Sequence, residues 1–267
     1  MDLASIVVLI GAGIAVGALA GFLGIGGTPL IAPAILFALL RVPTAETVAL
    51  RTSFGSALAA AAVLAGAGYV IHRRRADGQL RLAYVLGPAV AVGAFAGGSV
   101  ASRLGPDALR TVFAVGAFLI AAWMLLSTDK EESQPRSPAL WLGVPMGLAI
   151  GFFAALAGMG GAVFSIIILV NLFGYSMRTV TATSSFVQTC GAAFGCVGYA
   201  AAGWGKLSLV PLSLGYVNLP AAACVAAAGV PMAILGARFA HAARPGIARK
   251  VFAAVLVALA LHMLRVF

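Results

Sequence analysis

Apolar runs of roughly 20 residues recur along the whole of this sequence, and a run of that length crosses the hydrocarbon core of a bilayer as a helix. Of the 267 residues, 62% are hydrophobic and 9% are charged. The mean hydropathy is +1.08. A water-soluble domain needs more charge than this on its surface. The sequence therefore predicts an all-α, polytopic integral membrane protein.

A glycine-rich block occurs twice within these apolar runs. It reads GALAGFLGIGGTPLIAP at 17–33 and GFFAALAGMGGAVF at 151–164. In a bilayer, an unwound backbone is tolerated only where it is buried in protein or lines a watery cavity. Helices interrupted at matching places in two halves are the best sequence indication of a transporter's binding site. We therefore expect both blocks to interrupt their helices near such a site.

Two further blocks recur in the same order. TVALRTSF at 47–54 aligns with TVTATSSF at 179–186, and PDALRTVF at 106–113 aligns with PGIARKVF at 245–252. A charged stretch with serine and proline, at 128–138, divides the chain near its middle. We predict a first membrane repeat over 1–127, a polar linker over 128–138 and a second repeat over 139–267. The expected layout is about eight transmembrane helices, four per half, with glycine-broken first and fifth segments.

The charges leave the orientation open. Eight crossings would place similar numbers of Lys and Arg on the two sides, which does not orient the chain. If each glycine-broken segment instead re-entered the membrane, the halves could be inverted and the basic clusters near Arg74 and Arg249 would both be cytoplasmic. Whether the repeats are parallel or inverted is not decided by these counts.

The formal net charge of +10 is concentrated in short connections, chiefly at 72–75 and 244–250. In a soluble protein such an excess would suggest nucleic-acid binding. Basic residues beside membrane spans instead bind anionic lipid headgroups. We therefore expect membrane lipids, and no nucleic acid, as partners of these residues.

The glycine blocks supply the first candidate substrate site. Thr28-Pro29 follows the first block, and proline fits the first turn of a helix because no N–H is needed there. A helix that starts inside the membrane presents free N–H groups and a positive dipole end, which attract an anion. The alternative is a kink that serves packing alone. The candidate substrate-binding residues of this kind are Gly24, Gly26, Gly27, Thr28, Gly158, Gly160 and Gly161.

Polar side chains follow each glycine block at equivalent places. They could bind a polar solute, or they could simply satisfy helix carbonyls, which is the commoner role. Arg51 adds a cation that either faces a cavity or extends to the membrane surface. The candidates are Arg51, Thr52, Ser53, Thr183, Ser184, Ser185 and Gln188.

Carboxylates are absent from the apolar runs. Cation pumps and metal carriers usually place Asp, Glu or His there, so the sequence favours an anion or a neutral solute and no metal site. Glu46 is the carboxylate nearest to the predicted membrane region and the candidate for a proton relay. Motifs such as HExxH and GxSxG are missing. We expect neither an enzyme nor a cofactor.

With these residues in hand, the chain resembles the sulfite exporter TauE/SafE family of bacterial membrane permeases. The resemblance rests on Gly24-Ile25-Gly26-Gly27 with Thr52-Ser53, and on Gly158-Met159-Gly160-Gly161 with Ser184-Ser185. Thr28 and Ala162 depart from the pattern where a third glycine is often found. The resemblance implies transport of sulfite or an organosulfonate such as sulfoacetate, by a multi-pass protein of the bacterial inner membrane.

The function predicted from the sequence is a secondary transporter for a small anion, coupled to the proton gradient. The alternative is a passive anion pore or a structural membrane subunit whose glycines serve only helix packing. Saturable exchange separates the two, because a pore shows no counterflow. Substrate, direction of transport, coupling ion and oligomeric state stay open.

Overall fold

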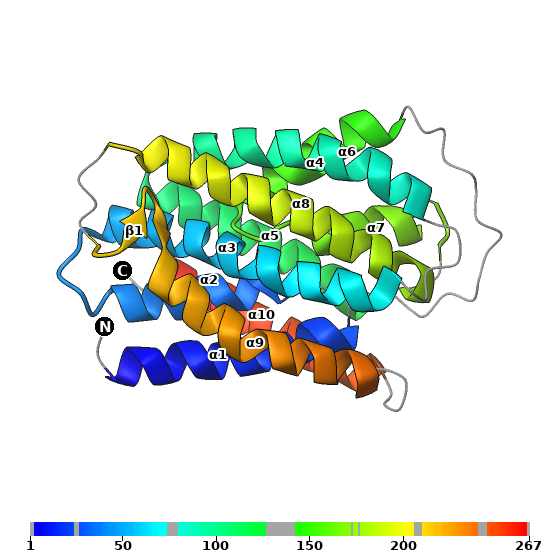
Figure 1. The fold of residues 1–267 in the computed structure, drawn as a ribbon, viewed down its shortest axis with the longest axis horizontal. Coiled ribbons are helices and arrows are strands. Elements are labelled where there is room, and N and C mark those ends of the chain that lie inside the picture. The colour runs from blue at the N-terminus through cyan, green and yellow to red at the C-terminus, as the bar shows by residue number, and fades with distance from the viewer. Residues whose placement is uncertain are drawn as a thin grey trace.

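The computed structural model describes residues 3–23, 27–73, 80–126, 142–171, 173–175, 177–205, 210–239 and 245–265. In these ranges the chain forms ten α-helices and one two-stranded hairpin (Figure 1). The helices are α1 (Leu3–Leu23), α2 (Thr28–Leu39), α3 (Glu46–His72), α4 (Leu80–Ala101), α5 (Pro106–Leu126), α6 (Gly143–Leu156), α7 (Ala162–Asn171), α8 (Met177–Gly203), α9 (Leu219–Phe239) and α10 (Pro245–Arg265). Strands β1 (Ser213–Leu214) and β2 (Val217–Asn218) pair antiparallel between α8 and α9.

Four helical stretches in the described ranges are long and apolar enough to cross a membrane, judged by length and composition. They are Glu46–His72, Leu82–Ala101, Pro106–Leu126 and Leu219–Gly236. Large apolar side chains such as Val63, Val92 and Phe153 point outward from the bundle. Apolar side chains on the outside of a helix bundle are stable in contact with lipid. The predicted all-α membrane fold fits this arrangement.

The two glycine-containing segments each form two helices. α1 ends at Leu23 and α2 begins at Thr28, while α6 ends at Leu156 and α7 begins at Ala162. The sequence-based number of about eight helices treated each of these segments as a single interrupted helix. For this reason the described residues contain ten helices.

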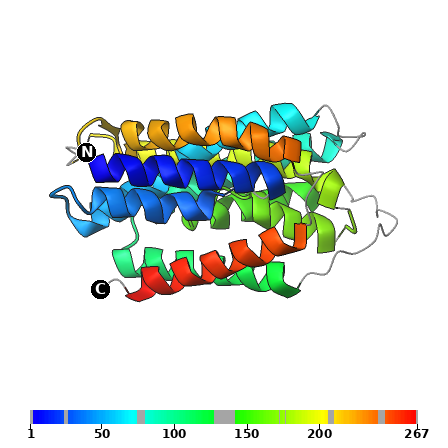
Figure 2. The same ribbon diagram turned by 90° about the horizontal axis from the view of Figure 1, so that it is seen from below.

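The helices of each such pair run in opposite directions. α1 leads away from the end of the bundle that holds the N-terminus, and α2 returns to that end beside it (Figure 2). α6 and α7 start and finish at the opposite end of the bundle (Figure 1). The N- and C-termini lie at the same end (Figure 2).

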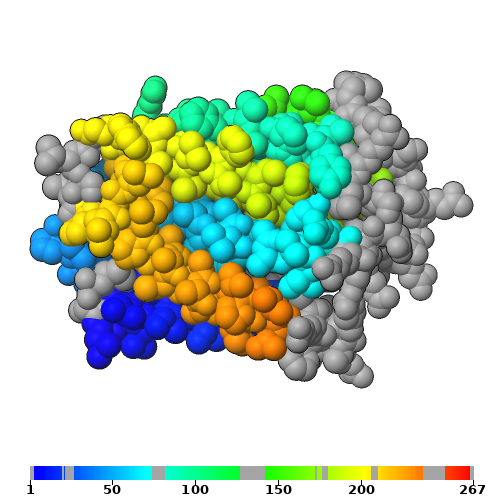
Figure 3. Space-filling view, in the orientation of Figure 1, coloured from blue at the N-terminus to red at the C-terminus, as the bar shows by residue number. Residues whose placement is uncertain are grey.

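Helices from the two parts of the chain interleave. α1 packs on α9, α6 packs on α4, and the long central helices α3 and α8 pack on each other. The side chains of α3 and α8 form a continuous surface with those of α9 (Figure 3). The stretches before and after the predicted linker therefore share one bundle. The linker itself, 128–138, lies outside the described residues.

Glycine allows the closest of these approaches. A Cβ atom at Gly17 of α1 would collide with the carbonyl oxygen of Gly229 in α9, and a Cβ atom at Gly151 of α6 would collide with that of Val90 in α4. Small residues at contacts of this kind let helix backbones pack closely in lipid, where van der Waals contact replaces the hydrophobic effect.

The connections at the two ends of the bundle differ in their number of Lys and Arg residues. Helix ends opposite the termini are joined by 73–79, 127–142 and 240–244, which contain Arg73, Arg74, Arg75, Lys130, Arg136 and Arg244, although this set also contains Asp77, Asp129, Glu131 and Glu132. Helix ends beside the termini are joined by 40–45, 102–105 and 204–218, which contain Arg41, Arg103 and Lys206. We call the first of these the basic end and the second the terminal end.

The β-hairpin packs at the terminal end between α3, α8 and α9. The backbone N–H of Asn218 donates to Ser56 Oγ at 2.7 Å. The Asn218 side-chain oxygen accepts from the backbone N–H of Ala221 at 3.0 Å, as an N-cap residue does at the start of a helix. The hairpin thus both starts α9 and fixes it against α3.

Candidate functional site

The break between α6 and α7 is built on glycines in the left-handed region. φ is +67° at Gly158, +74° at Gly160 and +101° at Gly161. Side chains with a Cβ rarely adopt these values. α7 then begins at Ala162. The backbone N–H of Ser165 donates to the carbonyl of Gly161, the last residue of the break, at 3.0 Å. The N–H groups of the first turn of a helix have no acceptor within the helix.

The first break is described from Gly27 onward. Gly24 and Gly26, two of the predicted site residues, lie outside the described residues. Gly27 is the N-cap of α2 and has no side-chain cap, and proline follows in the first turn. The Gly27 carbonyl accepts from the backbone N–H of Leu30 at 3.0 Å. α2, like α7, therefore begins inside the bundle, and its first residue is not capped by a side chain.

The two breaks meet. The Thr28 hydroxyl oxygen, at the first residue of α2, lies 3.4 Å from the position that a Cβ atom would take on Gly160. The side-chain amide of Gln188 in α8 donates to the same hydroxyl oxygen at 2.6 Å. Thr28 is 0% exposed and Gln188 is 3% exposed. Two helix N-termini, each with a positive dipole end, thus lie beside one buried polar pair.

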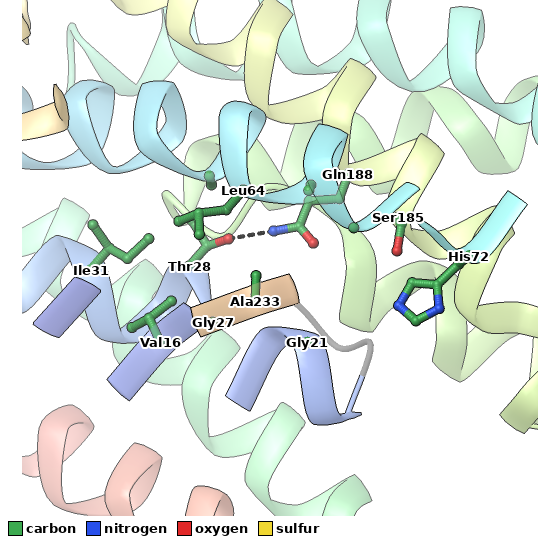
Figure 4. Close-up of a pocket in the computed structure, with 13 residues that line it drawn as sticks. Val16, Gly21, Gly27, Thr28, Ile31, Leu64, His72, Ser185, Gln188 and Ala233 are labelled. Carbon is green, nitrogen blue, oxygen red and sulfur yellow. Dashed lines mark hydrogen bonds between the residues drawn. The ribbon is translucent and has the colours of Figure 1, made fainter. Parts of the chain in front are cut away.

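A pocket adjoins this pair (Figure 4). Its described lining consists of Val16, Gly21, Gly27, Thr28, Ile31, Ala61, Leu64, Ala65, Gly68, His72, Ser185, Gln188 and Ala233. The cavity volume is about 20 Å³, room for one or two water molecules. The pocket is narrow in this conformation, and its lining comes from both parts of the chain.

The pocket brings together four of the residues predicted from the sequence, namely Gly27, Thr28, Ser185 and Gln188. Gly160 stands beside them through its contact with Thr28 and Gln188. No carboxylate is present among the described lining residues. The described parts of the chain also contain no group of three or more His, Cys, Asp or Glu side chains that could hold a metal ion.

Most of the predicted hydroxyl groups bind helix carbonyls. Ser53 Oγ donates to the carbonyl of Leu50 at 2.8 Å. Ser184 and Ser185 donate to the carbonyl of Thr181 at 3.0 and 2.8 Å. Thr52 and Thr183 are buried but are not part of the pocket lining. Ser185 alone among these hydroxyl residues lines the described pocket.

Arg51 lies away from the pocket, toward the terminal end. Its guanidinium donates to the Leu104 carbonyl at 2.9 Å and to the Tyr216 hydroxyl at 3.2 Å. It also lies over the Tyr216 ring, 5.6 Å from the centroid. These contacts join α3 to the α4–α5 connection and to the β-hairpin.

Glu46, the candidate for a proton relay, forms an ion pair with Arg110 at the start of α3. Arg110 is also 3.5 Å from Asp107. The pocket-lining part of α3 begins only at Ala61, 15 residues further along the helix, or roughly 22 Å. The carboxylate that the sequence singled out is therefore not in contact with the pocket.

His72 lines the pocket, although the sequence indicated only a position beside a loop. The spacing of small residues on α3 is consistent with a pocket that extends to His72. Ala61, Ala65 and Gly68 are three or four residues apart and put a stripe of small side chains on one face of α3, which leads to His72. A stripe of this kind is equally typical of plain helix packing, so the spacing alone could not assign the imidazole to a pocket.

An apolar helix bundle with two broken segments, which meet beside a pocket, is typical of multi-pass membrane transporters. The chain belongs to the sulfite exporter TauE/SafE family, whose model matches residues 7–263. It is a multi-pass membrane protein and a membrane transporter of that family.

Two curated relatives are similar over most of their length. A "Probable membrane transporter protein" of Haemophilus influenzae is 28% identical over 255 residues, which cover 93% of this chain and 95% of the relative. The "Probable membrane transporter protein YdhB" of Bacillus subtilis is 29% identical over 193 residues, which cover 70% of this chain and 76% of the relative. No solved structure matches the chain.

Proposed function

We propose that this protein is a secondary transporter that moves a small anion, sulfite or an organosulfonate, across the bacterial inner membrane. The observation that carries the proposal is the meeting of the two breaks at Thr28, Gly160 and Gln188. The N-terminal dipole ends of α2 and α7 supply partial positive charge without a cation. The absence of carboxylates among the described lining residues fits a negatively charged substrate.

At this point, hydrogen-bond donors of the protein would replace the water molecules that surround the anion in solution. Oxygen atoms of a sulfonate accept hydrogen bonds and have no protons to donate near neutral pH. The Gln188 amide, the Thr28 hydroxyl and the N–H groups of the first turns are donors of the required kind. The narrow cavity means that an anion can enter only when the helices around the pocket separate.

The proposed architecture is a pair of inverted repeats, 1–127 and 139–267, joined by the linker 128–138. Each repeat would comprise a glycine-broken helix pair followed by three helices. The reversed directions of the two pairs support inversion. Movement of one repeat against the other would then expose the site to each side in turn, as in other transporters built from inverted repeats.

The proposed orientation puts the basic end in the cytoplasm, since positively charged connections are retained on that side. Both chain termini would then be outside. The predicted basic clusters near Arg74 and Arg249 would lie on the same, cytoplasmic side.

Transport by purified protein in liposomes tests the proposal. We expect saturable uptake of sulfite or sulfoacetate, and counterflow when unlabelled anion is trapped inside. Uptake without saturation or counterflow would instead indicate a passive pore. Failure to bind or move sulfite, sulfoacetate, thiosulfate or sulfate in either direction would contradict the anion assignment.

A further inference from the structure

The lining of the pocket extends along α3 toward one end of the bundle. The Thr28–Gln188 pair is part of its lining, and its lining on α3 extends from Ala61 to His72. Eleven residues of helix separate these two positions, or roughly 16 Å along the axis. His72 is the last residue of α3, so this part of the pocket lies toward the basic end. In Figure 4 Ser185 and then His72 lie on that side of the polar pair.

The described lining is almost free of charge. Between the polar pair and the basic end it contains small or aliphatic side chains, the Ser185 hydroxyl and the His72 imidazole. His72 is the only titratable side chain among the described lining residues, which come from α1, α2, α3, α8 and α9. Arg73, the residue that follows α3, is exposed and is not part of this lining.

The imidazole of His72 lies at a helix end, beside the exposed Arg73. His72 lies in the last turn of α3. The C-terminal end of a helix carries partial negative charge, which stabilises a cation there. Imidazole changes its charge close to physiological pH. A histidine at this position is therefore a group of the kind that can bind both a proton and an anion.

We infer that His72 is the anion's first binding position on the basic side, where its protonated imidazole supplies the charge that the rest of the pocket lacks. The inference rests on the proposed function. A proton from the solution binds to a ring nitrogen of His72, and the anion then pairs with the imidazolium. Because anion and proton favour the same state, each raises the affinity for the other. Anion transport is thereby coupled to proton binding, at a residue other than Glu46.

Binding measured against pH tests the inference, with sulfoacetate and sulfate as probes because both stay fully ionised over the range used. Sulfite is unsuitable, because it changes its own charge near neutral pH. The variants are His72→Gln, which keeps hydrogen bonding without the charge, and His72→Arg, which keeps the charge at every pH. His262→Gln is the matched control, since His262 is an exposed residue of α10 outside the pocket lining.

We expect wild-type affinity to fall about tenfold as the pH rises through the titration of an imidazole, which is the loss of one charge-assisted contact. His72→Gln should bind weakly at all pH values, and His72→Arg should bind tightly at all of them. His262→Gln should follow the wild-type curve. A second readout uses diethyl pyrocarbonate, which carbethoxylates accessible imidazoles. Sulfoacetate should protect His72, but not His262, from it in the wild-type protein, as measured by mass spectrometry.

His72→Gln with a wild-type pH dependence, or no protection of His72 by the anion, would overturn the inference and leave the proposed function intact. A wild-type protein that binds neither probe at any pH would overturn the inference, and one that also fails to bind sulfite and thiosulfate would overturn the proposed function as well. Circular dichroism and gel filtration of each variant in detergent show whether it is folded. If His72→Gln is unfolded, His72→Arg decides, because retention of the wild-type pH dependence in that variant also overturns the inference.

Discussion

Gln188 in α8 donates a 2.6 Å hydrogen bond to the hydroxyl of Thr28, the first residue of α2, from 160 positions further along the chain. Both side chains are buried. Removal of one partner from a buried pair leaves the other unsatisfied, which costs about 1–3 kcal/mol. This bond joins the start of a broken helix to the opposite part of the chain, and both of its partners line the pocket.

Gln188→Leu should therefore weaken both stability and anion binding. We expect a loss of about 1–3 kcal/mol in the free energy of unfolding and a lower affinity for sulfoacetate, measured by thermal unfolding in detergent and by equilibrium binding. Thr189→Val is the control, because its hydroxyl donates to the Ser185 carbonyl at 2.8 Å and it does not line the pocket. Wild-type affinity in Gln188→Leu would remove the polar pair from the site.

Gly160→Ala should slow transport without preventing membrane insertion. Its φ of +74° costs a residue with a Cβ atom roughly 1–2 kcal/mol, and the new Cβ would lie 3.4 Å from both Thr28 and Gln188. A penalty of that size lowers the population of the competent conformation roughly 5–30-fold. The measurement is the initial rate of sulfoacetate uptake per amount of inserted protein.

The control for Gly160→Ala is Gly11→Ala in α1, where no atom lies within 4 Å of the added Cβ. This substitution should leave uptake unchanged. Equal uptake rates in both variants and the wild-type protein would show that the backbone conformation of the α6–α7 break is unimportant for transport.

Arg51→Gln should act on stability more than on anion affinity. The guanidinium bonds to Leu104 and Tyr216 stabilise the terminal end, and a hydrogen bond to a charged group contributes about 1.5–3 kcal/mol. We expect a lower unfolding temperature and an affinity close to wild type. Tyr216→Phe removes one of these bonds and should show part of the loss in stability. A large decrease in affinity in Arg51→Gln with unchanged stability would instead return Arg51 to the anion site.

Reporter fusions test the orientation. Alkaline phosphatase fused after Phe267 should be active, because it folds only outside the cytoplasm. Green fluorescent protein inserted in the 127–141 connection should fluoresce, because it matures in the cytoplasm. The reverse pattern would put the basic end outside, and it would place His72 on the external side of the pocket.

Several residues of the candidate site could be singled out from the sequence because their chemistry is unusual in an apolar run. Thr28 and Gln188 are polar side chains in membrane helices, and the glycine blocks occur twice, so both stood out without coordinates. Their contact with each other was not predictable. Nothing in the spacing of two residues 160 positions apart specifies that their side chains meet.

For other residues, the sequence does not show whether they lie at the pocket. Ser53, Ser184 and Ser185 each donate to a carbonyl of their own helix, yet only Ser185 lines the described pocket. The sequence places His72 at the start of a basic connection, whereas in the structure it is the last residue of α3 and lines the pocket. The sequence around such a residue does not show whether the neighbouring helix fills the space beside it or leaves a cavity there.

The sequence by itself determined that the chain forms apolar helices in a membrane and that two glycine blocks interrupt the pattern, because hydrophobicity and backbone freedom are properties of single residues. Only the tertiary structure decided that the helices reverse at those blocks, that α1 packs on α9 and α6 on α4, and that the pocket extends from Thr28 to His72. Those features depend on which helix faces meet. In lipid that choice is made by close packing between distant segments, and it leaves no periodic signal in either segment alone.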